Sequence, residues 1–294
     1  MNSLKIRNHK EVSQNNKLEV YNKPKIVYIP LLEDITLLVN KDDYVFKGSI
    51  LAKIKGKNNK NIYSSVSGKI KGFEEKRIHN NLIVKCIVIE NDFQERIESG
   101  YDKIKNLNVI SKTTFFKTLE NFGIQNIACF NNLRIDTLII NIEKYEALMY
   151  QKCEEILETI DLILEINNIN KVIIISKNKN LIKIINNYIG TYLNIKVKRI
   201  YKTNKKTYTI NDIGFIYNIY EILKYNKPIT EKIISINNIN ILVKIGTSIT
   251  EIMEYIGIDN GYNKDLIITN DLSIIDLEKN DGQNKSKNKN HILN

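Results

Sequence analysis

The first part of the chain alternates short apolar runs with polar turns. From Lys25 to about Asp92 these runs are a few residues long, rich in Ile, Val and Tyr, and separated by Lys, Asp, Asn and Gly. Runs of this length and composition are typical of β-strands. The pattern predicts a small all-β unit, to which we assign residues 24–104. A polar, irregular segment, residues 1–23, precedes it.

A different pattern begins near residue 105. Uniformly apolar strands alternate with segments whose apolar residues recur at helical spacing, which predicts a parallel sheet covered by helices. We assign this unit to residues 105–226. Ser111 and Gly123 are expected to begin and end its first helix. The predicted strands are RIDTLIIN, KVIIISK and NIKVKRIY, and the later helices are EALMYQKCEEILETIDLILEI and NKNLIKIINNYIG.

A third, smaller unit is predicted at residues 227–258. EKIISI and NILVKIG have the pattern of strands, and Thr247 is expected to cap the short helix TSITEIMEYIG. Beyond Ile258 the apolar pattern fades. Residues 259–294 are predicted to be a basic, disordered tail.

Composition limits the classes of function. The chain has 44 basic and 33 acidic residues, a net charge of +11 that would ordinarily suggest nucleic acid or an anionic membrane. However, Lys, Asn, Ile and Tyr are abundant, Trp is absent and Pro occurs three times, a composition typical of A+T-rich coding. The lysines also alternate with Asp and Glu, as on a solvated surface. We therefore predict a globular protein that does not bind nucleic acid.

Metal and secretion signals are absent from the sequence. Cys86, Cys129 and Cys153 form no CxxC pair, and the three histidines are equally scattered. Neither an iron–sulfur cluster nor a zinc site is predicted, and a reducing compartment fits these cysteines. Because no 18-residue apolar run and no secretion signal occur, we expect a cytoplasmic protein.

The stretch NIYSSVSGKI, residues 61–70, is predicted to be a strand entering a hairpin at Gly68. Together with KDDYVFKGSILAKI it resembles the barrel-sandwich hybrid fold of lipoyl and biotinyl carriers. In a carrier, a lysine at the hairpin tip holds the cofactor, and by spacing that position is Lys57. Gly56 and two asparagines surround Lys57, where carriers have Met, Ala or acidic residues. A modified Lys57 is therefore not expected.

A longer resemblance runs from about Asn8 to Ile258. The chain is similar to the RnfC family of the Rnf electron-transport complex and to the electron-transfer protein associated with proline reductase. The motifs in order are IPL, DYVFKG, SSVSGK, IVIEND, IDTLIIN, YEILKYNKPITEKI and ILVKIGTSITEIMEYIG. Tyr63 stands where that family often has His.

The resemblance implies a fold and its cofactors. It implies an N-terminal barrel-sandwich hybrid and a central Rossmann-like domain resembling the flavin-binding subunit of complex I. A small β-grasp of the SLBB type follows. The family uses FMN, NAD(H) and two four-iron clusters.

The departures from the family fall on the loops that bind cofactors. After IPL, Leu32–Thr36 form a shortened loop, and Gly123–Phe130 replace a glycine-rich phosphate loop. Only Gly123 could serve there, and a helix C-cap explains it better. Asn141 and Glu146 match a family loop whose glycine and proline are replaced here. The segment DIGFIYNIYEIL is about seven residues shorter than in the family. The cysteine motifs that bind the family's iron–sulfur clusters are missing.

The leading hypothesis is a degenerate, truncated RnfC-like chain that acts as an accessory or scaffold subunit of a redox complex. No catalytic residue, metal ligand or bound cofactor is expected, and Asn141 and Glu146 would be vestiges of the FMN/NAD loop. Its partners would be protein subunits, with a peripheral position on the inner face of the cell membrane left open.

Other interpretations stay open. The chain could be an active electron-transfer flavoprotein that couples NADH oxidation to a ferredoxin-type partner and uses Asn141 and Glu146. It could also be the product of a decaying gene. For Asn141 alone, a purely structural role as cap of the following helix is the simpler interpretation.

Overall fold

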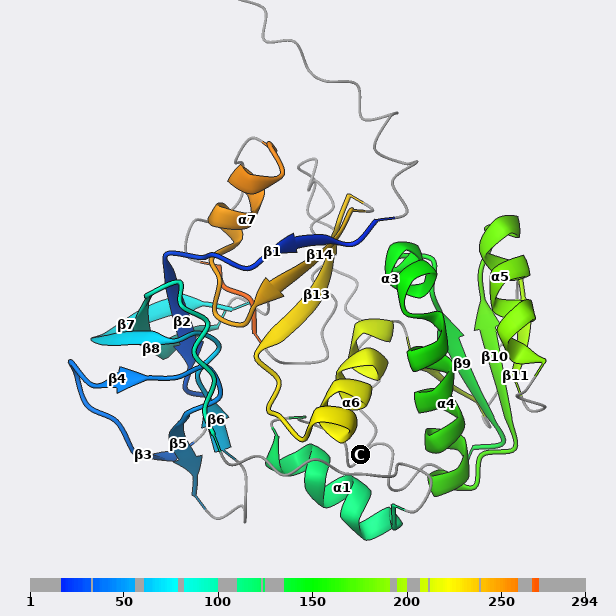
Figure 1. The fold of residues 1–294 in the computed structure, drawn as a ribbon, viewed down its shortest axis with the longest axis horizontal. Helices are drawn as coiled ribbons and strands as arrows, with labels where there is room; N and C mark the ends of the chain where they lie inside the picture. The colour runs from blue at the N-terminus through cyan, green and yellow to red at the C-terminus, as the bar shows by residue number, and fades with distance from the viewer. Residues whose placement is uncertain are drawn as a thin grey trace, which may run out of the picture.

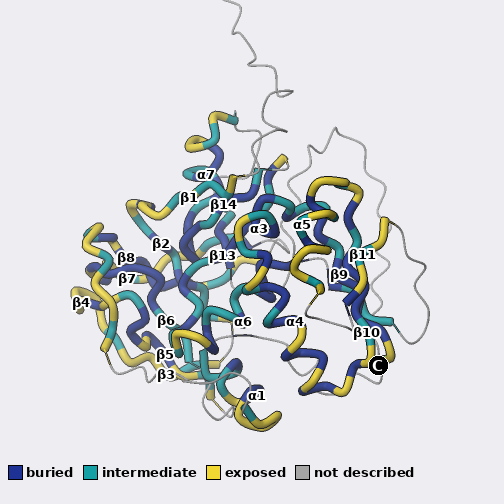
Figure 2. Tube along the Cα trace, turned by 45° about the vertical axis from the view of Figure 1, so that its right-hand side comes forward, coloured by how far each residue is buried: buried dark blue, intermediate teal, exposed yellow. Residues whose placement is uncertain are grey.

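The computed structural model describes residues 17–32, 34–55, 61–78, 82–99, 110–122, 124, 135–190, 195–199, 207–210, 212–237, 239–258 and 266–269. Three groups of elements lie side by side (Figure 1). A β-rich barrel is on the left, a three-stranded sheet is in the middle, and a parallel sheet with its helices is on the right. Figure 2 shows that buried residues run through all three groups.

The barrel contains two antiparallel sheets around one apolar core. The first has the order β2-β8-β7-β4 and the second the order β3-β5-β6. Apolar side chains from both sheets meet between them, among them Val27, Leu51 and Ile87, together with Val66 from the connection between the sheets. The strands are β2 (Ile26–Pro30), β3 (Ile35–Leu37), β4 (Tyr44–Val45), β5 (Ile50–Ile54), β6 (Asn61–Tyr63), β7 (Gly68–Arg77) and β8 (Ile83–Asn91).

The stretch SSVSG does not form the predicted hairpin. β6 pairs with β5, whereas β7 pairs with β4 and β8, so residues 64–67 carry the chain from one sheet to the other. Gly68 begins β7 between two strands, and a Cβ there would lie 2.0 Å from the Glu90 carbonyl oxygen. The glycine is needed because the backbones approach closely, not because of a hairpin turn.

The parallel sheet has the strand order β11-β10-β9-β12, and every pairing in it is parallel, as the apolar strands predict. The helices α4 and α6 pack against each other, and α5 contacts α4 and β11. The strands are β9 (Thr137–Asn141), β10 (Lys171–Ile175), β11 (Ile195–Lys198) and β12 (Thr207–Ile210). The helices are α1 (Lys112–Asn121), α3 (Glu146–Gln151), α4 (Cys153–Asn167), α5 (Lys179–Ile189) and α6 (Ile213–Tyr225).

One helix prediction in this unit is confirmed at its start, and another is wrong in its length. Ser111 does cap α1, accepting a hydrogen bond from the Thr114 N–H, whereas Gly123 lies outside the described residues. The predicted long helix from Glu146 is interrupted at Lys152, which separates α3 from α4. The apolar period continues across the break, so the sequence pattern alone does not reveal it.

The middle sheet joins distant parts of the chain. β1 (Glu19–Tyr21) pairs in parallel with β14 (Ile239–Lys244), which pairs antiparallel with β13 (Glu231–Ile236). Three residues of the predicted irregular segment 1–23 are therefore a strand. β1 and β13–β14 lie between the barrel and the parallel sheet (Figure 1).

The end of this unit also differs from the sequence prediction. Ser248, rather than Thr247, caps α7 (Ile249–Tyr255), while the Thr247 hydroxyl donates to the Lys244 carbonyl. Residues 266–269, which the sequence places in a disordered tail, include three almost fully buried side chains, Ile267, Ile268 and Thr269. Backbone bridges join them to Arg77 and Ser248.

Candidate functional site

The carboxyl edge of the parallel sheet is the first place to examine for a ligand. β10 and β11 lie on one side of β9, and β12, which comes later in the chain, lies on the other. Ligands of open parallel sheets bind outside the carboxyl ends of the strands where the order changes direction in this way. The loops after β9 and β10 and the start of α6 belong to this edge.

Asn141 ends β9 and closes a tight local turn. Its side-chain oxygen accepts a hydrogen bond from the Glu143 N–H at 3.1 Å. The prediction that it caps the next helix is wrong, because Tyr145 occupies the N-cap of α3 and makes no side-chain cap hydrogen bond. Asn141 therefore orders its own loop.

Glu146 joins the loop after β9 to the loop after β10. Its Oε2 accepts a hydrogen bond from Asn178 Nδ2 at 2.8 Å. Asn178 Oδ1 in turn accepts from the N–H groups of Asn180 and Leu181, the first turn of α5. A second link joins Lys177 Nζ and Glu143 Oε1 at 2.9 Å. The carboxylate of Glu146 thus orients the asparagine that caps α5.

Asp212 is the residue of this edge that the sequence analysis misses. Its buried carboxylate caps α6, accepting from the Phe215 N–H at 3.4 Å with the Gly214 amide nearby, and Tyr145 donates to it as well. Burial raises the pKa of the Asp212 carboxyl, an effect that Lys232 and the two backbone amides oppose. An aspartate directly before an apolar helical run is an N-cap pattern, so the signal was present in the sequence.

The described residues of this edge do not fit the phosphate of FMN or NAD(H). A phosphate binds at a helix N-terminus through free N–H groups. Here Asn178 and Asp212 already occupy those groups on α5 and α6. The same loops carry the carboxylates of Glu143 and Glu146, which repel phosphate. Most of the replaced glycine-rich loop, including Ile127, Cys129 and Phe130, lies outside the described residues.

A second polar cluster joins the barrel to the middle sheet. Lys244 Nζ lies 2.7 Å from Glu231 Oε1 and 2.8 Å from Glu95 Oε2, and Lys47 contacts the same two carboxylates. The Lys244 side chain is only 1% exposed. Burial alone would raise the pKa of Glu231, but Lys47 and Lys244 outweigh it and lower the pKa to about 2. We call these four residues the junction cluster.

The SSVSG corner adds hydrogen bonds to the same junction. The buried hydroxyl of Ser65 donates to the Ile245 carbonyl at 2.6 Å, and Ser67 donates to Asp92 Oδ1 at the same distance. Tyr63 donates to the Asn121 carbonyl at 2.7 Å and so joins the barrel to α1. Ser65 and Tyr63 therefore join the barrel to the rest of the molecule, whereas the Ser67 hydrogen bond lies within the barrel.

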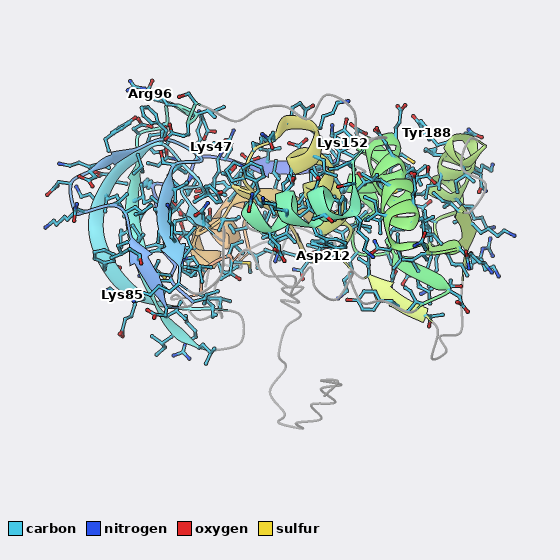
Figure 3. The ribbon with its side chains drawn as sticks, turned by 90° about the horizontal axis from the view of Figure 1, so that it is seen from below. Lys47, Lys85, Arg96, Lys152, Tyr188 and Asp212 are labelled. Carbon is cyan, nitrogen blue, oxygen red and sulfur yellow. The ribbon has the colours of Figure 1, made fainter. Side chains whose placement is uncertain are left out.

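The barrel also exposes most of the apolar surface of the molecule. Among the described residues, eleven of the fifteen exposed large apolar or aromatic side chains lie between Leu32 and Ile97. Around the edge strand β4, the rings of Tyr44 and Phe46 meet edge to face at 5.5 Å, and Arg96 lies over Tyr44. We call Tyr44, Phe46, Phe93 and Ile97 the barrel patch; Figure 3 shows Arg96 at this end of the molecule.

The described residues include two of the three cysteines of the chain. Among these described residues, no three His, Cys, Asp or Glu side chains are grouped to hold a metal ion. Cys86 and Cys153 are buried, and burial raises the pKa of each thiol to about 12. Cys129 and Lys57 lie outside the described residues. None of the described helices has the length and apolar character to cross a bilayer.

Comparison with known proteins identifies the N-terminal region. Residues 2–94 match the family model described as the RnfC barrel sandwich hybrid domain. This match supports the predicted barrel-sandwich hybrid and an RnfC-like N-terminal region, and it covers less than half of the chain. No curated protein matches the sequence.

Proposed function

We propose that this protein is an RnfC-like accessory subunit of an electron-transfer complex, a scaffold that has lost its own flavin and iron–sulfur sites. The match of residues 2–94 supports the RnfC-like part, since RnfC proteins work within multi-subunit electron-transfer complexes. The complex would be of the Rnf type or linked to proline reductase. The Rossmann-like nature of the parallel-sheet unit and the SLBB-like nature of the middle sheet belong to the same proposal.

The observation that carries the proposal is the position of Asp212. Its carboxylate accepts a hydrogen bond from the Phe215 N–H at the start of α6, beside the point where the strand order changes direction. A helix N-terminus at that point is where a parallel sheet binds a phosphate. In this proposal, the carboxylate of Asp212 serves the N-terminus of α6 that a phosphate would otherwise use.

The barrel patch supports a docking role. Contiguous exposed apolar side chains mark sites of protein–protein contact. Phe93 has a left-handed backbone, φ 59°, and its N–H donates to Asn91 Oδ1 at 2.9 Å. This Asx-type turn fixes where the exposed Phe93 ring leaves the end of β8. Protein subunits of the redox complex would contact this patch.

The first experiment asks whether cofactor binding survives. We expect the purified protein to lack the visible absorbance of flavin and of iron–sulfur clusters, and to show no saturable quenching of added FMN or NADH fluorescence. Bound flavin, or stoichiometric iron and sulfide, would contradict the proposal and favour the alternative of an active flavoprotein that uses Asn141 and Glu146.

The second experiment asks whether the barrel docks. We expect Phe46→Glu/Phe93→Glu to abolish copurification with the other subunits of the redox complex. A matched control is Tyr225→Glu/Tyr255→Glu, which changes two exposed aromatic residues outside the barrel. Retained copurification of the barrel variant, or equal loss in both, would remove the docking role from the barrel patch.

A further inference from the structure

The net charge of the protein is concentrated in one segment. Residues 166–211 contain ten basic residues and no Asp or Glu. The rest of the chain then has 34 basic and 33 acidic residues, which is almost neutral. The prediction that the lysines alternate with Asp and Glu is therefore wrong for this segment.

The structure gathers these cations at one margin of the parallel sheet. Six of them are exposed, on the loop after β10, on α5 and on β11 or directly after it. β11 is the last strand of the described sheet on that side. We call this set the cationic margin: Lys177, which is ion-paired with Glu143, and Lys179, Lys183, Lys196, Lys198 and Arg199.

The cations lie on both sides of the sheet margin instead of on one face of the sheet. Ile195 and Val197 of β11 pack into the apolar core, so Lys196 and Lys198 point to the opposite face of the sheet. Lys179 and Lys183 lie one turn apart on the exposed face of α5. Figure 3 shows this end of the molecule, where Tyr188 is labelled on α5, far from Lys47, Lys85 and Arg96 of the barrel.

The neighbouring helix has the opposite charge. The exposed residues Glu154, Asp161 and Glu165 of α4 lie on that helix, which packs against α5. A negatively charged surface is therefore attracted by the cationic margin and repelled by α4. This separation of charge favours one orientation, with the β11 side of the sheet toward the surface.

The chemistry of the cationic margin favours a lipid surface over a protein or a nucleic acid. The centre of a protein interface is rich in aromatic and apolar side chains. Among the described residues of 166–211, Tyr188 alone is a large, exposed side chain of this type. Recognition of bases uses arginine forks and several aromatic stacking platforms, whereas five of these six cations are lysines. Adsorption to anionic lipid needs only the summed charge of lysines near the surface.

We propose that the cationic margin binds the anionic headgroups of a phospholipid bilayer and holds the protein peripherally, with the sheet margin toward the membrane. This function is separate from the docking of the barrel patch, and it requires no other subunit. Failure of either proposal leaves the other intact, because the two surfaces lie at opposite ends of the molecule (Figure 1).

The test is co-sedimentation of the full chain with vesicles of phosphatidylcholine, alone or mixed with phosphatidylglycerol. We expect binding to the mixed vesicles only, weakening as salt is added. In Lys179→Gln/Lys183→Gln/Lys196→Gln the affinity should fall about a hundredfold, since each lysine near an anionic surface contributes about a factor of five. The control Lys23→Gln/Lys41→Gln/Lys53→Gln removes the same charge from exposed positions elsewhere and should bind as the wild type does.

Other results would overturn the proposal. Absence of wild-type binding to the mixed vesicles at low salt would do so, as would an equal loss in the control variant, which would indicate bulk charge. Tighter binding to single-stranded or duplex DNA than to vesicles, lost in the first variant, would assign the margin to nucleic acid. Sedimentation without vesicles that requires the same three lysines would assign it to a second copy of the chain, through the acidic α4. Identical urea unfolding curves for the variants and the wild type confirm that their folds are retained.

Discussion

The SSVSG corner of the barrel and the carboxyl edge of the parallel sheet both engage their polar side chains in hydrogen bonds, but over different distances along the chain. Ser65 donates to a carbonyl 180 residues away. Asn141 accepts from an N–H two residues on, and Glu146 accepts from a side chain 32 residues on. The corner therefore holds separate units together, whereas the edge orders its own loops. Both regions resemble family motifs, yet their side chains have different structural roles. Variants in the two regions should therefore differ most in their effect on the free energy of unfolding.

The largest effect is expected at Gly68. The Cβ added by Gly68→Ala would lie 2.0 Å from the Glu90 carbonyl oxygen. We expect the free energy of unfolding to fall by about 5 kcal/mol, or the variant not to fold at all. Gly72→Ala is the matched control in the same strand, with a positive φ but no atom within 4 Å, and should cost about 1–2 kcal/mol. Urea unfolding measures both. Similar costs would show that backbone strain rather than close approach governs β7.

The next effect is expected in the junction cluster. The Lys244 side chain is 1% exposed, and Glu231→Gln removes one of the two carboxylates that contact its ammonium. We expect this variant to lower the free energy of unfolding by about 3 kcal/mol. Glu90→Gln, which removes the exposed pair with Lys71, should cost less than about 1 kcal/mol. Thermal and urea unfolding of the two variants test whether an ion pair in the junction cluster contributes more to stability than an exposed one. A larger loss at Glu90 would contradict this.

The same cluster predicts a dependence on pH. The pKa of Glu231 in the folded protein is about 2, below its ordinary value of 4.5, so its stabilising contribution is complete above about pH 4.5 and is lost as the pH falls toward 2. The difference in unfolding free energy between wild type and Glu231→Gln should therefore shrink over that interval. Urea unfolding at a series of acid pH values measures it. A difference that stays constant would show that the ion pairs do not cause it.

The smallest effect is expected at the sheet edge. In Glu146→Gln the amide oxygen can still accept the hydrogen bond from Asn178, so the unfolding free energy should change by no more than about 0.5 kcal/mol. If the proposed function holds, the electron-transfer activity of the complex should not change either. Stability and activity assays check this together. Loss of activity with unchanged stability would restore a catalytic role to this loop.

The local pattern of the sequence predicts much of the fold. Apolar runs such as TLIIN and KVIII are strands of a parallel sheet, because only a strand covered on both faces is apolar throughout. Ser111 caps its helix as expected, because a cap needs only neighbouring residues. These features are decided within a few residues, and single-sequence reasoning reaches them.

The failures involve partners that are distant in the sequence. Lys232 and Lys244 lie in strands and are buried, although lysine in an alternating pattern ordinarily indicates the solvent face. Burial of Lys244 is possible because Glu231 and Glu95 surround its charge, and Glu95 belongs to another unit of the chain. Likewise, the pairing partners of β7 decide that SSVSG crosses between sheets, and its own residues do not.

The parallel pairing of β1 with β14 has a consequence for the order of folding. Glu19 is paired with Ile241, so a strand made early in synthesis waits for nearly the whole described chain before its partner exists. The barrel can collapse while translation continues, but the middle sheet cannot close until β14 has left the ribosome. Closing so long a loop is slow, so the rate-limiting step of refolding should be the joining of β1 to β14. A nascent chain released before Lys244 would contain a folded barrel without the complete middle sheet that it packs against.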